Sequence, residues 1–322
     1  MSLAIGVDLG GTNLRSAVVD PHTFALIEHD KERVGEPRDV DSIVERVASA
    51  VERHAARSTG PVTVGIGLAA MLKDRRGNVA NSPHLRWNEV PFGQLLATRL
   101  GSRFAVGVYN DVNAIVWGEA VAGSGRGSRD VLGVYVGTGI GGGIIAGGQL
   151  VEGATNCAGE IGHVKVRWDE AALTCACGQR GCVEAYVGGI YVQQRITEEL
   201  TAGAKSTAIE LAGGIANVNP GHVDAAAAGG DEWALGLWGE LAPLLAIALG
   251  NAVSLLNPER LVLGGGLLGR APTLYDLVLT SLPLVATKAS MDALTVVHAT
   301  LEDDAGLVGA AALAARGVSL IQ

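Results

Sequence analysis

Apolar, strand-like segments of the chain end in glycines at three places. These segments are AIGVDLGGT at 4–12, VLGVYVGTGIGGG at 131–143 and RLVLGGG at 260–266. After the first two, the strand pattern resumes as LRSAVVD and IIAGGQLVEG, so a unit of strand, glycine turn and strand is used twice. The pattern therefore predicts tight turns at the ends of buried strands.

Helical and extended patterns alternate between the first two glycine turns. A helix is predicted over about 40–57, because its inward positions share one face: Ile43, Val44, Val47, Val51 and His54. Buried strands are predicted at 62–68 and 104–111, with a short helix near 92–100 between them. Strands that alternate with helices indicate an α/β fold. We expect two related α/β domains, with ligands in the cleft between them.

Composition narrows the class of protein. A chain of 322 residues with 48% hydrophobic residues is long enough for about two well-packed domains. The net charge is −9 and no run of lysine and arginine occurs, which argues against a nucleic-acid partner. The longest apolar run, 241–256, is broken by Pro243 and is shorter than the roughly 20 residues of a membrane span, so we predict a buried helix and no membrane partner. The N-terminus lacks the cationic start of a signal peptide, which favours a cytoplasmic location.

Three of the four cysteines lie in CACGQRGC at 175–182. A chain of this length with so few cysteines is unlike a disulfide scaffold, so a metal site or redox chemistry is the more plausible use. The spacing C-x-C-x4-C lacks the C-x-x-C of redox motifs and favours a metal, although a fourth ligand must come from elsewhere. The remaining Cys157 is expected to be a small packed residue.

The glycine turns are candidates for phosphate binding, because glycine lets backbone N–H groups converge on an anion. GTGIGG at 137–142 satisfies the dinucleotide pattern G-x-G-x-x-G, but a strand and hairpin follow it where that pattern requires a helix. A Walker A loop is excluded because the chain contains no Gly-Lys pair. Any one of these turns could be a plain hairpin. Three strand-to-glycine turns together favour a nucleotide.

The order of the motifs resembles that of the ROK family, which joins bacterial sugar kinases to sugar-responsive repressors. The motifs are DLGGTNLR at 8–15, NDVNA at 110–114, GTGIGGG at 137–143, GEIGH at 159–163, CACGQRGC at 175–182 and NPERLVLGGG at 257–266. The resemblance implies the two-domain, actin-like and ribonuclease-H-like α/β fold. It extends to DAGLVGAAALAA at 304–315, a helix that in the family returns to the N-terminal domain. The implied domains are 1–111, completed by 304–322, and 112–303.

The resemblance also implies an ATP-dependent sugar kinase with magnesium. Phosphoryl transfer needs phosphate cradles, a metal and a residue that accepts the proton of the attacking hydroxyl. The implied nucleotide and phosphate residues are Asp8, Gly10, Gly11, Thr12, Gly137, Thr138, Gly139, Gly264, Gly265 and Gly266. Asp111 matches the general base of the family, and a strand's carboxyl end suits that role. Taken alone, Asp111 fits better as the N-cap of the helix that follows it, and only the other motifs together favour catalysis.

Sugar and zinc ligands follow from the same resemblance. The implied sugar-binding residues are Asn110, Asp111, Glu160, His163 and Glu184, and the implied zinc ligands are His163, Cys175, Cys177 and Cys182. Three thiolates and an imidazole with no open position suit a structural zinc. We further predict that His163 binds zinc through one ring nitrogen and a sugar hydroxyl through the other.

Two positions depart from the family pattern. Asn156 stands where members commonly carry glycine, and asparagine tolerates a left-handed backbone better than most residues. At 67–77 this chain has GLAAMLKDRRG, where the family usually has a glycine followed by an acidic residue in a loop near the sugar. Met71, Leu72 and Lys73 are therefore candidates to reshape the sugar pocket or to form an interface. Trp87 is expected to be a packing residue rather than a sugar platform.

The resulting expectation is a glucokinase that phosphorylates the 6-hydroxyl of glucose and forms a homodimer or homotetramer. The alternatives within the family are an N-acetylmannosamine or N-acetylglucosamine kinase and a fructokinase. A non-catalytic sugar-sensing protein is the alternative from another class, and a repressor would need a DNA-binding segment ahead of DLGGT, where only seven residues stand.

Overall fold

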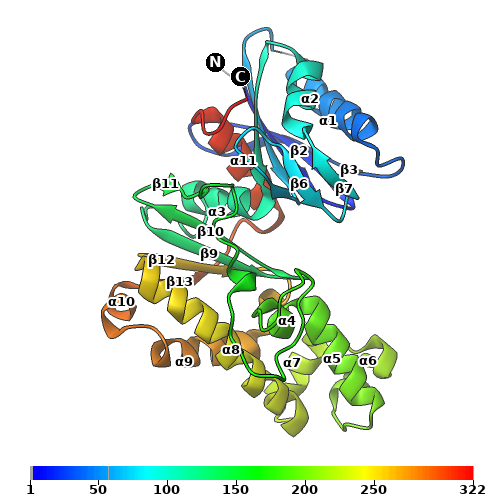
Figure 1. The fold of residues 1–322 in the computed structure, drawn as a ribbon, viewed down its shortest axis with the longest axis vertical. Helices are drawn as coiled ribbons and strands as arrows, with labels where there is room; N and C mark the ends of the chain where they lie inside the picture. The colour runs from blue at the N-terminus through cyan, green and yellow to red at the C-terminus, as the bar shows by residue number, and fades with distance from the viewer. Residues whose placement is uncertain (1–2, 57, 322) are drawn as a thin grey trace. The chain divides into compact units, whose positions relative to one another are not determined.

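The computed structural model describes residues 3–56 and 58–321, which form two compact units (Figure 1). Unit 1 comprises Met1–Val131, Gly143–Gly159 and Val297–Gln322, and unit 2 comprises Leu132–Gly142 and Glu160–Val296. The boundaries predicted from the family resemblance, after residues 111 and 303, stay a prediction.

A five-stranded sheet forms the centre of unit 1. Its order is β3-β2-β1-β4-β8, in which β2 is antiparallel to both of its neighbours, β1 and β3, whereas β1, β4 and β8 are parallel. The elements of this region are β1 (Leu3–Leu9), β2 (Asn13–Val19), β3 (Leu26–Arg33), α1 (Val40–Ala55), β4 (Val62–Leu68), α2 (Phe92–Leu100), β8 (Phe104–Asn110), α3 (Asp111–Ala122) and α11 (Ala305–Ala315). A small antiparallel sheet adds β5 (Met71–Leu72), β6 (Val79–Ser82) and β7 (Trp87–Val90).

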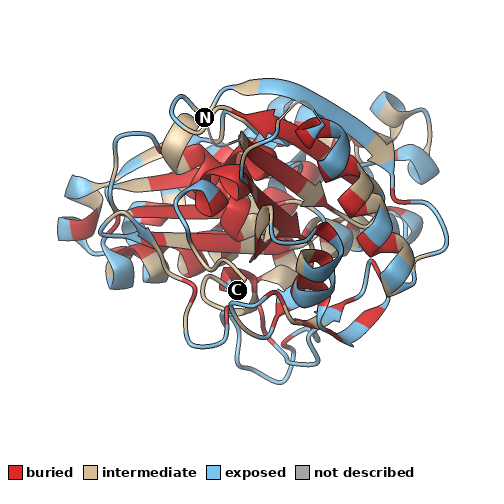
Figure 2. Ribbon diagram, turned by 90° about the horizontal axis from the view of Figure 1, so that it is seen from above, coloured by how far each residue is buried: buried red, intermediate tan, exposed pale blue. Residues whose placement is uncertain are grey.

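Helices cover both faces of this sheet. One face packs on α1 and α2 around buried residues such as Ile5, Val64 and Val106. The opposite face receives α11, which also packs on α3 (Figure 1). In the part of the chain that the structure describes, buried residues concentrate on strands and inward helix faces, whereas loops and outer helix faces are exposed (Figure 2).

Glycines allow α11 to lie almost at backbone contact with its neighbours. A Cβ atom added at Gly65 on β4 would lie 1.8 Å from the carbonyl oxygen of Ala310, and one at Gly118 on α3 would lie 2.2 Å from that of Ala305. No real Cβ contact is that short, so these positions require glycine. Glu119, which is 0% exposed, fixes the chain just ahead of α11 by accepting bonds from the N–H groups of Thr300 and Leu301 at 2.8 and 2.7 Å.

The second five-stranded sheet has the order β11-β10-β9-β12-β13. Its strands and the remaining helices are β9 (Val131–Val136), β10 (Ile140–Ala146), β11 (Gln149–Leu150), α4 (Glu184–Val187), α5 (Gly189–Thr201), α6 (Ala208–Ala212), α7 (Pro220–Ala228), α8 (Glu232–Leu256), β12 (Arg260–Gly264), α9 (Pro272–Ser281), α10 (Lys288–Ala293) and β13 (Thr295–His298). Strands β9, β10 and β13 each include a point where the chain passes from one unit to the other.

The main elements predicted from the sequence are confirmed. The helix predicted over 40–57 spans Val40–Ala55, with Asp39 as its N-cap, and position 57 lies outside the described residues. The segment after GTGIGG is strand β10 rather than a helix, which removes the dinucleotide interpretation. The apolar run at 241–256 forms part of α8. Among the described residues, α8 is the one helix long and apolar enough to cross a bilayer, and 44% of its apolar window is buried in the fold.

Candidate functional site

Asp8 lies near the carboxyl end of β1 and pairs in register with Arg15 on β2. The guanidinium of Arg15 is 2.5 Å from the Asp8 carboxylate and also binds Asp303, whose backbone oxygen accepts at 2.7 Å. Burial raises the pKa of Asp8 above its ordinary value, and Arg15 opposes that rise. Sequence reasoning missed Arg15, although it is the last residue of DLGGTNLR.

The turn after Asp8 is held by short backbone contacts. Gly10 donates its N–H to the Asn13 carbonyl at 3.1 Å, and the Thr12 carbonyl accepts from Val34 at 2.9 Å. A Cβ atom at Gly11 would lie 2.6 Å from Cβ of His84, so the turn passes directly over that side chain. The predicted phosphate residues of this motif are therefore fixed in one tight turn.

Asn110 and Asp111 stand where β8 ends and α3 begins. The Oδ1 atom of Asn110 accepts from the N–H groups of Val112 and Asn113 at 3.0 and 3.1 Å, so Asn110 is the N-cap. The alternative that Asp111 caps this helix is wrong: Asp111 is the first helical residue, half-buried at the positive end of the helix dipole. Because β1, β4 and β8 are parallel, Asp8 and Asp111 lie at the same edge of the sheet, two strands apart.

In unit 2, the two glycine turns meet at the ends of β9 and β12. Leu267 donates its N–H to the Val136 carbonyl at 2.9 Å, and Gly265, with φ of +94°, lies so close that a Cβ atom would be 2.5 Å from the same oxygen. The first amides of α5 bind the other turn: Gly189 donates to the Gly137 carbonyl at 2.8 Å and Ile190 to that of Thr138 at 3.0 Å.

A cavity of about 480 Å³ opens beside these turns. Of the predicted nucleotide residues it brings together Gly137, Thr138 and Gly266. Gly139, Gly264 and Gly265 are not part of its lining. The other lining residues are Gly189, Ile190, Gln193, Asn219, Pro220, Gly221, Leu267 and Arg270.

Arg270, Asn219 and Gln193 are polar residues of this cavity that sequence reasoning missed. The Arg270 side chain lies over the glycine turn that precedes it: a Cβ atom added at Gly266 would be 3.5 Å from Nη2 of Arg270. Asn219 caps α7, and Asp224 of that helix accepts from the N–H groups of Thr273 and Leu274 at the start of α9. Two sequence signals could have indicated the first two of these residues. Arg270 is a basic residue four positions after a glycine turn, and Asn219 begins an Asn-Pro-Gly sequence, which is typical of a helix start.

Glu160, His163 and Glu184 lie together in unit 2. The Nε2 atom of His163 is 3.8 Å from the Glu160 carboxylate. Burial raises the pKa of Glu160, His163 lowers it, and the negative charge of Glu184 raises it further. Glu184 also accepts from the backbone N–H of Ile140 at 2.8 Å, and Gly139 leaves room for that contact, since a Cβ atom there would be 2.5 Å from the carboxylate.

His163, Cys175, Cys177 and Cys182 are brought into one cluster, in which the ligand atoms lie within 4.8 Å of one another. The Sγ atoms of Cys177 and Cys182 are 3.7 Å apart, and Cys175 Sγ is 3.8 Å from Nδ1 of His163. Ligands of a tetrahedral zinc with Zn–S bonds of about 2.3 Å lie roughly 3.8 Å apart, so the donors and their spacing fit that metal. The same ring directs its two nitrogens to different partners, Nδ1 to the thiols and Nε2 to Glu160.

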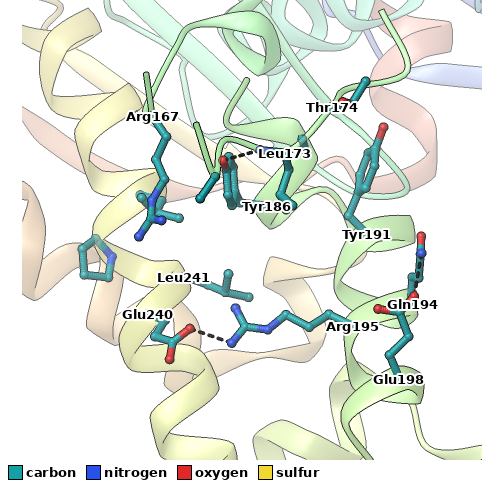
Figure 3. A pocket seen from close by; sticks show the side chains of 14 residues that line it. Arg167, Leu173, Thr174, Tyr186, Tyr191, Gln194, Arg195, Glu198, Glu240 and Leu241 are labelled. Atoms are coloured by element: carbon teal, nitrogen blue, oxygen red, sulfur yellow. Dashed lines mark hydrogen bonds and ion pairs between the residues drawn. The ribbon is translucent and has the colours of Figure 1, made fainter. Parts of the chain in front are cut away.

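A larger cavity, of about 770 Å³, lies beside the cysteine loop (Figure 3). Its polar side chains are engaged in the fold: Tyr186 accepts from the Leu173 N–H at 2.8 Å, and Arg195 pairs with Glu240 at 2.6 Å. Tyr191, on the same wall, accepts from the Ala176 N–H at 2.7 Å. No site residue predicted from the sequence lines this cavity, and its tyrosines serve to hold the loop that carries the thiols.

Within the segment 67–77, residues 67–68 end β4, and Met71–Leu72 form β5 at the edge of the small sheet. Leu72 is 1% exposed and belongs to the core, and Lys73 pairs with Glu89 of β7. That this segment reshapes a sugar pocket stays a prediction. Met71 is 47% exposed. Trp87 is buried against Phe92 with ring centroids 5.3 Å apart, as its packing role predicts. Asn156 adopts φ of +62°, which confirms its predicted tolerance of a left-handed turn.

Comparisons with known proteins agree over nearly the whole chain. The chain is 35% identical to a glucokinase of Streptomyces coelicolor over 318 residues, which cover 98% of both proteins, and 31% identical to a glucokinase of Thermotoga maritima, with 96% of both covered. A crystal structure of a ROK family glucokinase from Streptomyces griseus, in complex with glucose and AMPPNP, matches with a TM-score of 0.78 and 33% identity, over 98% of this chain and 100% of that one.

The fold is therefore the two-domain, actin-like α/β fold of the ROK kinases. A model of the ROK family matches residues 4–317. With a match of that extent and full-length relatives above 30% identity, the chain belongs to the ROK family.

Proposed function

We propose that this protein is an ATP-dependent hexose kinase that converts glucose to glucose 6-phosphate. The observation that carries the proposal is Asp111 at the carboxyl end of β8, in a chain that is similar over 98% of its length to a glucokinase. Asp8, at the same sheet edge, supplies the second carboxylate that phosphoryl transfer from a magnesium nucleotide requires.

Asp111 acts as the base that accepts the proton of the 6-hydroxyl as that oxygen attacks the phosphoryl group. Asp111 lies in the first turn of α3, where the helix dipole favours a negatively charged group. Asp8, held by Arg15, would help to hold the magnesium, which would neutralise charge on the phosphates. In the tight turn at Gly10, Gly11 and Thr12, the N–H of Gly10 closes the turn on the Asn13 carbonyl, and the N–H groups of Gly11 and Thr12 serve the transferring phosphate.

The donor nucleotide occupies the cavity beside Gly137, Thr138 and Gly266. Its walls combine glycine turns, which let phosphates approach the backbone, with one guanidinium from Arg270. Gly265 serves this site indirectly by letting its turn pack at backbone contact with Val136, and Gly139 does so by leaving room for the Glu184 carboxylate. Gly264 is the last residue of β12, directly before that turn.

Glu160, His163 and Glu184, together with Asn110, take the sugar hydroxyls in pairs. Asn110 does so while capping α3, since its carboxamide also holds the backbone. His163, Cys175, Cys177 and Cys182 would hold a structural zinc, which would have no open position for catalysis. His163 would bind it through Nδ1, which would fix the ring, and Nε2, next to Glu160, would then be directed to the sugar. We also propose a cytoplasmic homodimer or homotetramer.

A coupled assay of ADP release over a panel of hexoses and N-acetylhexosamines tests the reaction and its substrate. Glucose is expected to give the highest kcat/KM. An N-acetylhexosamine or fructose preferred by about tenfold or more, equal to roughly 1.4 kcal/mol in transition-state binding, would replace the glucokinase assignment by one of its relatives. Absence of turnover on every sugar, with sugar binding retained, would indicate a sensing protein.

Asp111→Asn keeps the size of the side chain and removes its basic oxygen. We expect kcat to fall by a factor on the order of 10² to 10⁴, because the proton of the hydroxyl loses its acceptor. Binding of glucose, measured by calorimetry, is expected to change far less. Full turnover by this variant would leave Asp111 with a structural role only.

Removal of the metal, by chelation or by Cys177→Ser, is expected to weaken glucose binding by about 10- to 100-fold, because the His163 ring is no longer fixed. Nucleotide binding is expected to change little, since the cavity beside Gly137 has its own hydrogen bonds. Calorimetric titration of the folded, metal-depleted protein with each ligand separates the two effects. Unchanged glucose affinity in protein shown to be free of zinc would contradict the proposed link.

A further inference from the structure

The loop at 71–78 is held by a second segment of unit 1, residues 152–157. Three contacts join them. Arg75 lies 3.2 Å from the carboxylate of Glu152, Asn156 Nδ2 donates to the Asp74 carbonyl at 3.1 Å, and Cys157 Sγ is 3.7 Å from the Leu72 carbonyl. We call residues 152–157 the clasp. It contacts the loop at three residues, Arg75, Asp74 and Leu72.

Asn156 makes the buried contact of the clasp. It is 6% exposed, and its φ of +62° lies in the region that few side chains adopt. Its amide donates to the loop, whereas Oδ1 is buried and has no hydrogen-bond partner in the described structure. Leaving such an acceptor unpaired is unfavourable, and native structures carry few of them. A strained, incompletely paired side chain at a turn is typical of a functional position.

Asp74, the residue that Asn156 holds, organises the whole loop. Its carboxylate accepts from the backbone N–H of Arg76 at 2.8 Å and from the side-chain amide of Asn78 at 2.7 Å. Asp74 therefore links the two ends of this turn, and displacement of Asp74 would also displace Arg76 and Asn78. By contrast, the Arg75 side chain is 63% exposed, so its ion pair contributes little on its own.

The loop and the clasp each continue into residues of the proposed sugar site. Just before the loop, the Ala70 carbonyl accepts from Nδ2 of Asn110 at 3.3 Å, next to Asp111. Just after the clasp, the chain reaches Glu160. At its other end the clasp is anchored by Glu152, which is 7% exposed and accepts from Ser319 Oγ at 3.0 Å. Loosening of the clasp would thus free the loop beside Asn110 and leave the sheet intact.

We propose that Asn156 is a specificity-determining residue that, by clasping the loop at 71–78, makes the site discriminate against hexoses with a bulky substituent. The inference rests on the proposed sugar kinase function. A loop held at a fixed position rejects a substrate that needs more room, whereas a mobile loop accommodates it. Asn156 acts through the loop and is a positioning residue, not a catalytic one.

The test compares wild type with Asn156→Gly and Asn156→Asp. Glycine adopts φ of +62° without strain and removes the contact, and aspartate keeps the shape but cannot donate to the Asp74 carbonyl. Asn257→Gly is the matched control, because Asn257 is also left-handed, at φ of +48°, but is exposed at the end of α8. Thermal unfolding shows that each variant is folded.

Limited trypsin digestion measures how often the loop opens, because trypsin cleaves after lysine and arginine and the loop contains Lys73, Arg75 and Arg76. We expect both Asn156 variants to be cleaved there about tenfold faster or more, because local opening becomes easier. The ratio of kcat/KM for glucose to that for N-acetylglucosamine is expected to fall by about tenfold, mainly through KM for the sugars, with KM for ATP within about twofold of wild type. Asn257→Gly is expected to match wild type in the cleavage rate, in the ratio of kcat/KM values and in KM for ATP.

Unchanged cleavage in Asn156→Gly overturns the clasp, and faster cleavage with unchanged sugar selectivity overturns its role in specificity. A wild-type protein that phosphorylates no sugar refutes the proposed function instead, and with it the selectivity claim, whereas the digestion still reports on the clasp itself.

Discussion

The structure of unit 1 depends on contact between backbones, which only glycine permits. Helix α11 approaches β4 at Gly65 and α3 at Gly118 so closely that any side chain would overlap a carbonyl oxygen. Because α3 begins at Asp111, its distance from α11 and from the sheet fixes the position of the proposed base. The segment before α11 carries Asp303, which binds Arg15 and so helps to hold Asp8. Both carboxylates therefore depend on one packing arrangement.

The same principle operates in unit 2 on a smaller scale. Gly265 lets the turn after β12 lie on Val136, and Gly139 lets Glu184 reach the amide of Ile140. Glu184 belongs to the helix that directly follows the cysteine loop, and its carboxylate is 3.7 Å from Sγ of Cys175, so the proposed zinc ligands contact a proposed sugar residue. A metal site with no open position can in this way influence a substrate site without entering the chemistry.

Sequence patterns predicted the strands, the glycine turns and the grouping of the three thiols with His163, because these follow from local periodicity and from a family pattern of motifs. They did not predict that Asn110 rather than Asp111 caps α3, since both residues are good caps and only the backbone decides between them. The ion pair of Asp8 with Arg15 depends on strand register, and the place of Arg270 in the cavity depends on α7 and α9. The ion pair of Lys73 could not be predicted for the same reason, because its partner Glu89 lies on strand β7, which only the fold brings close to it.

The most direct test of the packing constraint is the unfolding temperature of Gly118→Ala compared with Gly236→Ala. Both glycines are helical, and alanine alone should stabilise a helix by up to about 1 kcal/mol. Gly236 has open space around its Cβ position and should follow that rule, whereas a Cβ atom at Gly118 must push α11 away. We predict a higher unfolding temperature for Gly236→Ala, a lower one for Gly118→Ala because overpacking costs about 1–3 kcal/mol, and a fall in kcat only in the latter. A Gly118→Ala protein that is as stable as Gly236→Ala and fully active would contradict the account.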